Sequence, residues 1–301
     1  MKVFMRISRA QFLPVILSPV VLGTAVAWQA SGTVDVLFLG LALLGSGLLL
    51  LATNIINDVY DYVHGVDSVS DRMFPPEFPG WKVLPRGLVT LGTAKTWAYL
   101  SYLGGVIVGV YFLVVAGPTP FVLALLGIVA SYFYVAPPAK ADYRGLVLGE
   151  LSIFAAFGPI PAMGAYFIQV QRLDLLPLLA SLPLGLLTMC VLINHDLIFH
   201  DPYKATGKRS LTVVLGRSAA IRVSAVISSL VYVYAVLLVF LGVFPTSTLL
   251  ALVALPALGS LLAVYGKKDL QIPDYGKATM RSFLHSVLFG ALLAVGFFLG
   301  Q

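Results

Sequence analysis

Polar side chains interrupt the end of a long apolar stretch, "LATNIINDVYDYVHGVD", at residues 51–67. A helix turns about 100° per residue, so Asn54, Asp58 and Asp61 fall within a stripe about 60° wide and can point into one cavity. Gly65 then allows the chain to leave the helix. Acids just past a helix end are often solvated loop residues, but ionisable groups inside an apolar span are costly and usually functional.

A second polar cluster ends a later apolar stretch, "VLINHDLIFHDPYKATGKRSL", at residues 191–211. On an unbroken helix Asp196 and Asp201 would face about 140° apart, so either the helix unwinds between them or only one reaches a shared site. The other polar residues of this stretch are Asn194, His195 and His200, with Lys204, Lys208 and Arg209 in the predicted loop beyond.

Two carboxylate clusters on separate helices that open to one aqueous side predict a site for a hard divalent cation. Mg²⁺ typically binds through a few carboxylates together with substrate phosphates. The nearby Lys and Arg residues could bind the phosphate charge that the metal leaves uncompensated. His195 and His200 could instead support a transition metal, but no HExxH-like spacing is present, which disfavours zinc.

The third informative stretch, residues 134–169, reads "YVAPPAKADYRGLVLGELSIFAAFGPIPAMGAYFIQ". Two prolines end the preceding helix, and a polar loop follows. Gly158 and Gly164 allow close approach of either a neighbouring helix or a ligand. Aromatic residues surround the clusters; most belong to a bundle core or interfacial belt, but some could stabilise a developing carbocation through their π faces. They include Tyr60, Tyr62, Tyr132, Tyr134, Tyr143, Phe154 and Phe157.

The helices that must position these residues have the composition of a membrane protein. Hydrophobic residues make up 59% of the chain and charged residues only 11%, which is not a soluble composition. We predict an all-α, polytopic bundle around a central cavity, built as one domain over residues 1–301, because a membrane span needs about 20 apolar residues. The nine predicted transmembrane helices lie near residues 11–29, 35–60, 96–115, 119–136, 147–168, 175–198, 219–242, 246–265 and 281–299.

The basic residues lie at the N-terminus or in and beside the loops after the second, fourth, sixth and eighth spans. Arg172 is the one exception among the 19 Lys and Arg residues. This bias predicts a multi-pass protein of the cell membrane whose N-terminus and polar loops are cytoplasmic and whose C-terminus is outside. The net charge of +6 is thus explained by topology and membrane lipids, with no need for nucleic acid. The single Cys190 excludes a disulfide framework.

Four stretches give the chain a resemblance to the UbiA superfamily of intramembrane prenyltransferases, most closely to its MenA-type, dihydroxynaphthoate-prenylating branch. They are "FLPVILSPVVLGTAVA", "NIINDVYDYVHGVD", "YRGLVLGE" with "FGPIPAMGAYFIQ", and "GKRSLTVVLGR". The resemblance implies Mg²⁺ and a prenyl diphosphate bound by two aspartate motifs. The second motif departs from the family form, because its acids fall two and seven residues after Asn194 and the usual arginine is missing.

The resemblance implies a role for each matching residue. Asp58, Asp61, Asp196 and Asp201 are expected to be catalytic and to ligate the metal. The residues expected to bind the substrate diphosphate are Asn54, Arg72, Lys140, Tyr143, Arg144, Asn194 and Lys208.

The predicted reaction is Mg²⁺-dependent transfer of a prenyl group to an aromatic quinone-precursor acceptor, as in menaquinone biosynthesis. The acceptor could instead be a lipid, a glycerol-phosphate ether of archaeal-type lipid synthesis. A cation-coupled transporter is the alternative of another class, but its acids would lie near the midplane and not at one face. A CDP-alcohol phosphotransferase would need a DGxxAR-containing motif, which the sequence lacks.

Overall fold

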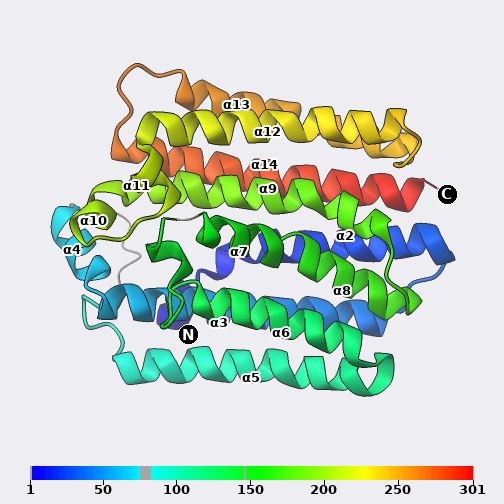
Figure 1. Ribbon diagram of the computed structural model, residues 1–301, viewed down its shortest axis with the longest axis horizontal. Helices are drawn as coiled ribbons and strands as arrows, with labels where there is room; N and C mark the ends of the chain where they lie inside the picture. The colour runs from blue at the N-terminus through cyan, green and yellow to red at the C-terminus, as the bar shows by residue number, and fades with distance from the viewer. Residues whose placement is uncertain (1, 75–82, 146, 301) are drawn as a thin grey trace.

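The computed structural model describes residues 2–74, 83–145 and 147–300, and all regular elements within these ranges are helices, as predicted (Figure 1). The long helices are α2 (Leu13–Ser31), α3 (Val36–Val63), α5 (Leu91–Ala116), α6 (Pro118–Phe133), α9 (Leu175–Ile198), α12 (Arg217–Phe240) and α14 (Ile272–Leu299). The shorter ones are α1 (Lys2–Ile7), η1 (Ala10–Phe12), α4 (Val66–Met73), η2 (Ala141–Tyr143), α7 (Leu148–Ala156), α8 (Pro159–Val170), α10 (His200–Ala205), α11 (Leu211–Leu215), η3 (Thr246–Ala254) and α13 (Leu255–Tyr265).

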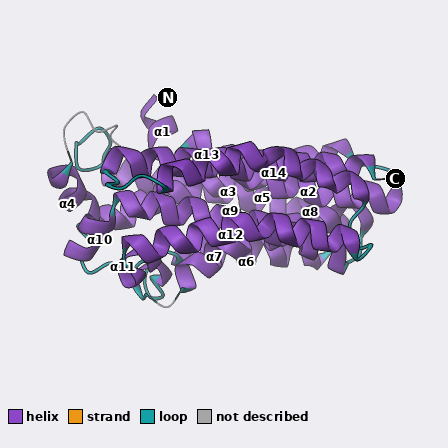
Figure 2. Cartoon of the chain, turned by 90° about the horizontal axis from the view of Figure 1, so that it is seen from above, coloured by secondary structure: helices purple, strands orange, loops and turns teal. Residues whose placement is uncertain are grey.

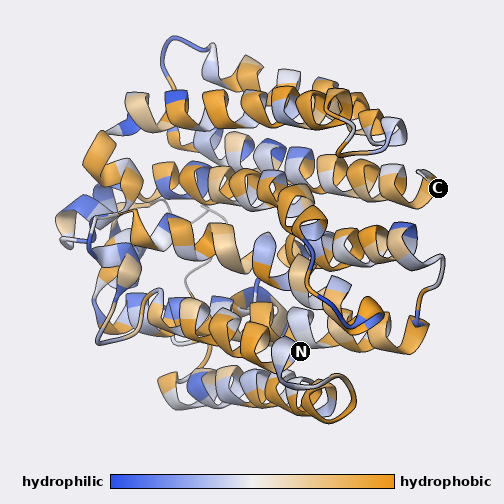
Figure 3. Ribbon diagram, turned by 45° about the vertical axis from the view of Figure 1, so that its right-hand side comes forward, coloured by the Kyte–Doolittle hydropathy of each residue, from blue (hydrophilic) through white to orange (hydrophobic). Residues whose placement is uncertain are grey.

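The long helices run side by side in one elongated bundle. In both Figure 1 and Figure 2, α4 and α10 lie at one end of the bundle and the C-terminus at the other. Hydrophobic residues cover the helices along their length, and hydrophilic residues gather toward the ends, most densely at the left-hand end in Figure 3. The short helices and polar residues therefore share one end of the bundle.

Eight helical segments of the described chain are long and apolar enough to cross a membrane. The predicted count of nine is not confirmed, because the ninth candidate, α6, has only 16 residues. At 1.5 Å per residue α6 is about 24 Å long, short of the roughly 30 Å of a hydrocarbon core. Three of the eight segments each combine two consecutive helices: η1 with α2, α7 with α8, and η3 with α13.

Local sequence signals set the helix ends. The side chain of Asp35 accepts a hydrogen bond from the amide of Phe38 and caps α3, and Thr90 caps α5 in the same way. Each cap satisfies an amide that the first turn of a helix leaves without a partner. Gly65, at a φ of 82°, turns the chain from α3 into α4, in the left-handed region that favours glycine. This turn brings α4 to the polar end of the bundle.

Close helix packing explains the break between α7 and α8. A Cβ atom on Gly158 would lie 2.8 Å from the Cα of Gly185 on α9, which is nearer than real Cβ atoms approach. Gly158 therefore serves packing. A Cβ on Gly164 would meet only Leu123 Cδ1, at 4.0 Å, and Gly164 lines a cavity described below.

Candidate active site

Five buried aspartates gather at the polar end of the bundle. They come from four elements, so distant parts of the sequence meet there. Each is no more than 3% exposed, and an unpaired charge at such a depth would be strongly destabilising. The five are Asp58 and Asp61 on α3, Asp67 on α4, Asp142 on η2 and Asp196 on α9.

Lys208 joins two of these carboxylates. Its Nζ atom lies 3.1 Å from both carboxylate oxygens of Asp61 and 2.7 Å from Oδ2 of Asp142, and the side chain is 1% exposed. The rings of Tyr203 and Tyr143 lie 4.2 and 5.0 Å from the ammonium, a distance at which aromatic faces attract a cation. Burial alone would lower the pKa of Lys208, but Asp142 and Asp61 outweigh it and raise the pKa well above its ordinary value.

Tyr143 completes this group from the same loop as Asp142. Its hydroxyl donates to Oδ1 of Asp61 at 2.5 Å. Burial and the nearby charge of Asp61 raise the pKa of Tyr143, so the phenol stays protonated and remains a donor at neutral pH. The predicted residues Asp61, Tyr143 and Lys208 therefore meet directly.

Arg9 pairs with Asp58, the other acid of the first motif. Asn54 supports this pair, since its Nδ2 donates to the carbonyl oxygen of Ser8, the residue before Arg9, at 2.9 Å. Burial would lower the pKa of Arg9, but the charges of Asp58 and Asp67 raise it overall. The guanidinium is thus a fixed positive charge in the wall of the site.

Arg9 and Asp142 were not predicted as site residues. In the sequence, Arg9 is one of the basic residues at the N-terminus that indicate membrane topology. Asp142 is part of the polar loop that follows the two prolines. A basic residue one position before a span, at the membrane face where the acids lie, is the signal that could have identified Arg9.

The two acids of the second motif lie in different surroundings. Asp196 is 2% exposed and lines a cavity, with His195 Nδ1 3.5 Å from its Oδ1. The helix breaks at Phe199, where α9 ends and α10 begins. Beyond the break, Asp201 is 58% exposed and pairs with Arg217 at 2.9 Å and with His200 at 3.0 Å. The hydrogen bond with His200 and the charge of Arg217 lower the pKa of Asp201.

Asn194 points away from the acids. Its Nδ2 donates to Ser224 Oγ at 3.1 Å and to the carbonyl oxygen of Cys190 at 2.8 Å, and its Oδ1 accepts from the Tyr265 hydroxyl at 2.6 Å. These bonds join α9 to α12 and α13. Diphosphate binding by Asn194 stays a prediction without a direct contact in its support.

The remaining predicted basic residues lie further out. Arg72 is exposed on α4. Arg144 is also exposed, and it donates to the carbonyl oxygens of Ala139 and Pro138, at 2.5 and 2.9 Å, within its own loop. Lys140 is half-buried, with Nζ 6.0 Å from the Tyr143 ring. All three lie at the polar end of the bundle and are less buried than the acids.

A cavity with an empty volume of about 870 Å³ opens beside the acids. Its wall combines charged, amide and aromatic side chains, including Tyr134 and Phe157 among the aromatic residues singled out from the sequence. The polar residues of the wall are Arg9, Thr53, Asn54, Asn57, Asp142, Thr188, His195, Asp196 and Thr279. We call it the polar cavity.

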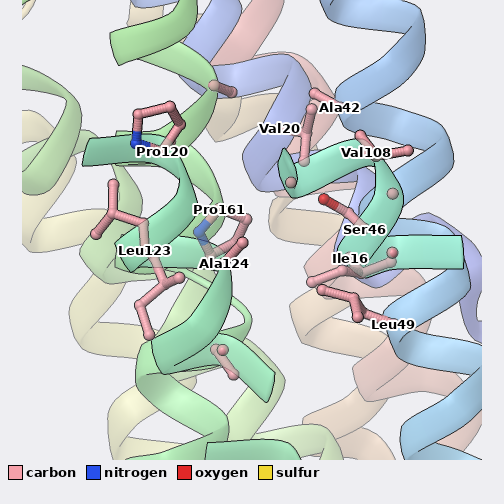
Figure 4. A pocket seen from close by; sticks show the side chains of 18 of the residues that line it. Ile16, Val20, Ala42, Ser46, Leu49, Val108, Pro120, Leu123, Ala124 and Pro161 are labelled. Carbon is pink, nitrogen blue, oxygen red and sulfur yellow. The ribbon is translucent and has the colours of Figure 1, made fainter. Parts of the chain in front are cut away.

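A second, apolar cavity lies deeper, between α2, α3, α5, α6 and α8. Figure 4 shows side chains such as Ile16, Leu49 and Leu123 converging on it, with the hydroxyl of Ser46 as a labelled polar group. The two cavities share three wall residues: Leu50, Thr53 and Phe157. A molecule with a charged head and a long apolar tail would match this pair of cavities.

The donor chemistry of the site fits a hard cation. Oxygens of Asp61 and Asp142 both lie within 3.1 Å of one point, the Nζ atom of Lys208, and carboxylate oxygens are the ligands that Mg²⁺ prefers. Within the described ranges, no three His, Cys, Asp or Glu residues are close enough to hold an ion by themselves. A metal there would need further ligands, as Mg²⁺ commonly takes from water and substrate phosphates.

Most of the chain matches one known protein family. Residues 16–299 match the UbiA prenyltransferase family. The chain is 26% identical over 297 residues to 1,4-dihydroxy-2-naphthoate octaprenyltransferase of Bacillus subtilis, covering 98% of this chain and 92% of that one. It is 30% identical over 220 residues to the Escherichia coli enzyme of the same name, covering 71% and 68%.

The fold is similar to that of a solved UbiA homolog from Archaeoglobus fulgidus bound to DMAPP and Mg²⁺. The TM-score is 0.61 at 15% identity, and the match covers 97% of this chain and 99% of the other. The family match spans nearly the whole chain and overlaps all eight apolar segments. The chain is therefore a multi-pass membrane enzyme that belongs to the UbiA prenyltransferase family.

Proposed function

We propose that this enzyme transfers a prenyl group from a prenyl diphosphate to an aromatic quinone precursor within the membrane, with Mg²⁺ as cofactor. The observation that carries this proposal is the junction of the two cavities at Leu50, Thr53 and Phe157. The polar cavity suits a diphosphate head, and the apolar cavity suits an isoprenoid tail. The relatives from B. subtilis and E. coli are named for prenylation of dihydroxynaphthoate, which supports an aromatic acceptor.

The acidic and the basic residues of the site have different roles in the proposed reaction. Asp58 and Asp61, together with Asp196, which lines the polar cavity, would hold the cation, and Asp201 stays a predicted ligand at the surface. When bound, Mg²⁺ supplies positive charge that stabilises the diphosphate leaving group. Arg9 and Lys208 add positive charge beside the same position, which lowers the cost of breaking the bond between C1 and the diphosphate oxygen.

The allylic cation that forms must be kept from water until the acceptor attacks its C1. The apolar wall beyond Thr53 excludes water, and the faces of Phe157 and Tyr134 are placed where they can attract positive charge. The acceptor carbon then forms the new bond to C1 and releases its proton.

The basic loops and the acid cluster lie at the same end of the bundle, and the chain's positive charge bias supports a cytoplasmic mouth. In this orientation a soluble acceptor or a phosphorylated substrate reaches the polar cavity from the cytoplasm, and the tail remains among lipids.

A transfer assay tests the proposal. Purified protein in nanodiscs receives radiolabelled geranylgeranyl diphosphate, with Mg²⁺ or with EDTA, and one of three acceptors: dihydroxynaphthoate, 4-hydroxybenzoate or geranylgeranylglyceryl phosphate. Mg²⁺-dependent labelling of dihydroxynaphthoate or 4-hydroxybenzoate supports the proposal. Labelling of the glycerol phosphate alone would identify the lipid-synthesis alternative, and failure to bind the diphosphate would favour a transporter.

A further inference from the structure

Asp61 and Asp142 share a single ammonium. Two carboxylates and one lysine leave one net negative charge in a group whose three members are each at most 3% exposed. Buried charges are stable only when they are compensated. A divalent cation would neutralise the carboxylate pair fully, whereas the lysine does so only in part.

Asp142 has capacity for another ligand. Its carboxylate is buried and lines the polar cavity. Lys208 and the side chain of Tyr134 hydrogen-bond with it, and a carboxylate has about four lone-pair sites in all. Burial raises the pKa of Asp142, and Lys208 partly opposes this. A buried acceptor facing a cavity is suited to coordinating a cation from that cavity.

The backbone around Lys208 is fixed, although its side chain has four rotatable carbon–carbon bonds. The amide of Lys208 donates to the carbonyl oxygen of Tyr203 at 2.9 Å. Three residues later, the amide of Leu211 donates to Glu150 Oε1, also at 2.9 Å. The backbone can therefore stay in place when the ammonium leaves the acids, while the rings of Tyr203 and Tyr143 that contact it must adjust.

We propose that Asp142 and Asp61 form a divalent-cation site and that Lys208 competes with the cation for it. The ammonium of Lys208 occupies the shared position until a divalent cation displaces it. The displaced ammonium then lies at the edge of the polar cavity, where it can pair with a phosphate. The inference rests on the proposed function only for the choice of cation and phosphate.

Competition of this kind makes cation and diphosphate binding cooperative. A cation alone must separate Lys208 from two carboxylates, which weakens its apparent affinity. When a diphosphate is present, the released ammonium gains a new anionic partner, and part of this cost is recovered. Each ligand therefore increases the affinity for the other.

The test measures Mn²⁺ binding by electron paramagnetic resonance, without diphosphate, in nanodisc-reconstituted protein. Lys208→Gln should bind Mn²⁺ about tenfold more tightly than wild type, as expected when a competitor that fills nine-tenths of the sites is removed. Asp142→Asn should bind about tenfold more weakly, because it loses a ligand. Lys204→Gln, an exposed lysine in the same segment, should bind as wild type does.

Thermal unfolding gives a second reading that does not depend on turnover. Lys208→Gln should unfold at a lower temperature than wild type in EDTA, and Mn²⁺ should restore most of the difference. Unchanged or weaker Mn²⁺ binding in Lys208→Gln, or undiminished binding in Asp142→Asn, would overturn the proposal. Asp142→Asn retains the pair between Lys208 and Asp61, so it decides the question if Lys208→Gln does not fold.

The transfer assay separates this inference from the proposed function. Mn²⁺ affinities that change as expected in a protein without prenyl transfer would leave the cation site intact and reject the function. Prenyl transfer by wild type, together with unchanged Mn²⁺ affinities in Lys208→Gln and Asp142→Asn, would support the function and reject the cation site.

Discussion

Glu150 on α7 accepts a hydrogen bond from the backbone amide of Leu211 at 2.9 Å, and so holds the segment that carries Lys208 against the bundle. Leu211 begins α11, and its amide is among those that a helix start leaves without an internal partner. A carboxylate 61 positions earlier in the chain thus fixes the backbone of a site residue.

Replacement of this acceptor should weaken both fold and site. Glu150→Ala leaves a buried amide unpaired, which costs about 1–3 kcal/mol, and should lower the unfolding temperature and the kcat of prenyl transfer. Glu150→Gln retains an acceptor oxygen and should keep near-normal stability. Equal loss in both variants would show that the charge of Glu150, and not the hydrogen bond, is what matters.

The stability of the protein should depend on the ion pair between Arg9 and Asp58, and not on either charge alone. Arg9→Met leaves Asp58 buried with its main charge partner removed, and breaking a buried ion pair costs about 3–5 kcal/mol. The double variant Arg9→Met with Asp58→Asn should recover stability but not transfer. Arg6→Gln, at an exposed position of the same segment, is the matched control. A double variant no more stable than Arg9→Met would argue against the pairing.

The two acids of the second motif should differ in their effect on activity. Asp196→Asn removes a buried carboxylate from the cavity wall and should reduce kcat/KM by about 100-fold, the scale of losing one charged group at a reacting centre. Asp201→Asn breaks an exposed pair with Arg217, whose contribution to stability is about 1 kcal/mol or less, and should leave most of the activity. The reverse order would show that Asp201 is the ligand.

The apolar cavity should set the length of the prenyl chain. Gly164→Leu places a side chain into this cavity and should reduce turnover of long prenyl diphosphates at least about tenfold, because overpacking costs about 1–3 kcal/mol, while a ten-carbon substrate is still used. Gly40→Leu is the control, since an added Cβ there meets nothing within 4 Å. Equal loss for all chain lengths would contradict this placement of the tail.

The ion pairs of Lys208 should survive alkaline conditions. Its folded pKa lies well above the ordinary value, which is about 10.4 for lysine. A group with a raised pKa contributes stability that is complete below the unfolded pKa and is lost as pH rises through the folded pKa. The difference in unfolding temperature between wild type and Lys208→Gln should therefore stay constant from about pH 7 to about pH 9.5. A steady decline across that window would show that Lys208 titrates normally.

The sequence predicted the helical bundle and the end at which the acids gather, because long apolar runs and intramembrane charges are strong signals. The sequence predicts that Asn54, Asp58 and Asp61 can face one cavity. In the structure Asn54 lines the polar cavity, whereas Asp58 pairs with Arg9 and Asp61 with Lys208. The ninth predicted span is not confirmed, because α6 is apolar but has only 16 residues.

The partners of these side chains could not be read from the sequence, because they depend on how each helix is rotated against its neighbours. Asn194 follows the same local pattern as Asn54, yet it faces α12 and α13. Asp142 lies in a loop, and no periodic pattern in the sequence predicts the path that brings this loop to Lys208. The break at Phe199, which separates Asp196 from Asp201, is followed by Pro202, which has no amide to bond the carbonyl of Ile198, so the sequence does carry a signal for it.

The most direct test of the account is prenyl transfer by Asp58→Ala and Asp61→Ala in protein shown to fold. Wild type and variants are reconstituted at equal amounts with radiolabelled prenyl diphosphate, dihydroxynaphthoate and Mg²⁺, and prenylated product is measured. Asp71→Ala is the control, because this acid is partly exposed and pairs with Arg86. We expect transfer by wild type and Asp71→Ala and none by the other two variants; transfer retained by both Asp58→Ala and Asp61→Ala would contradict the account.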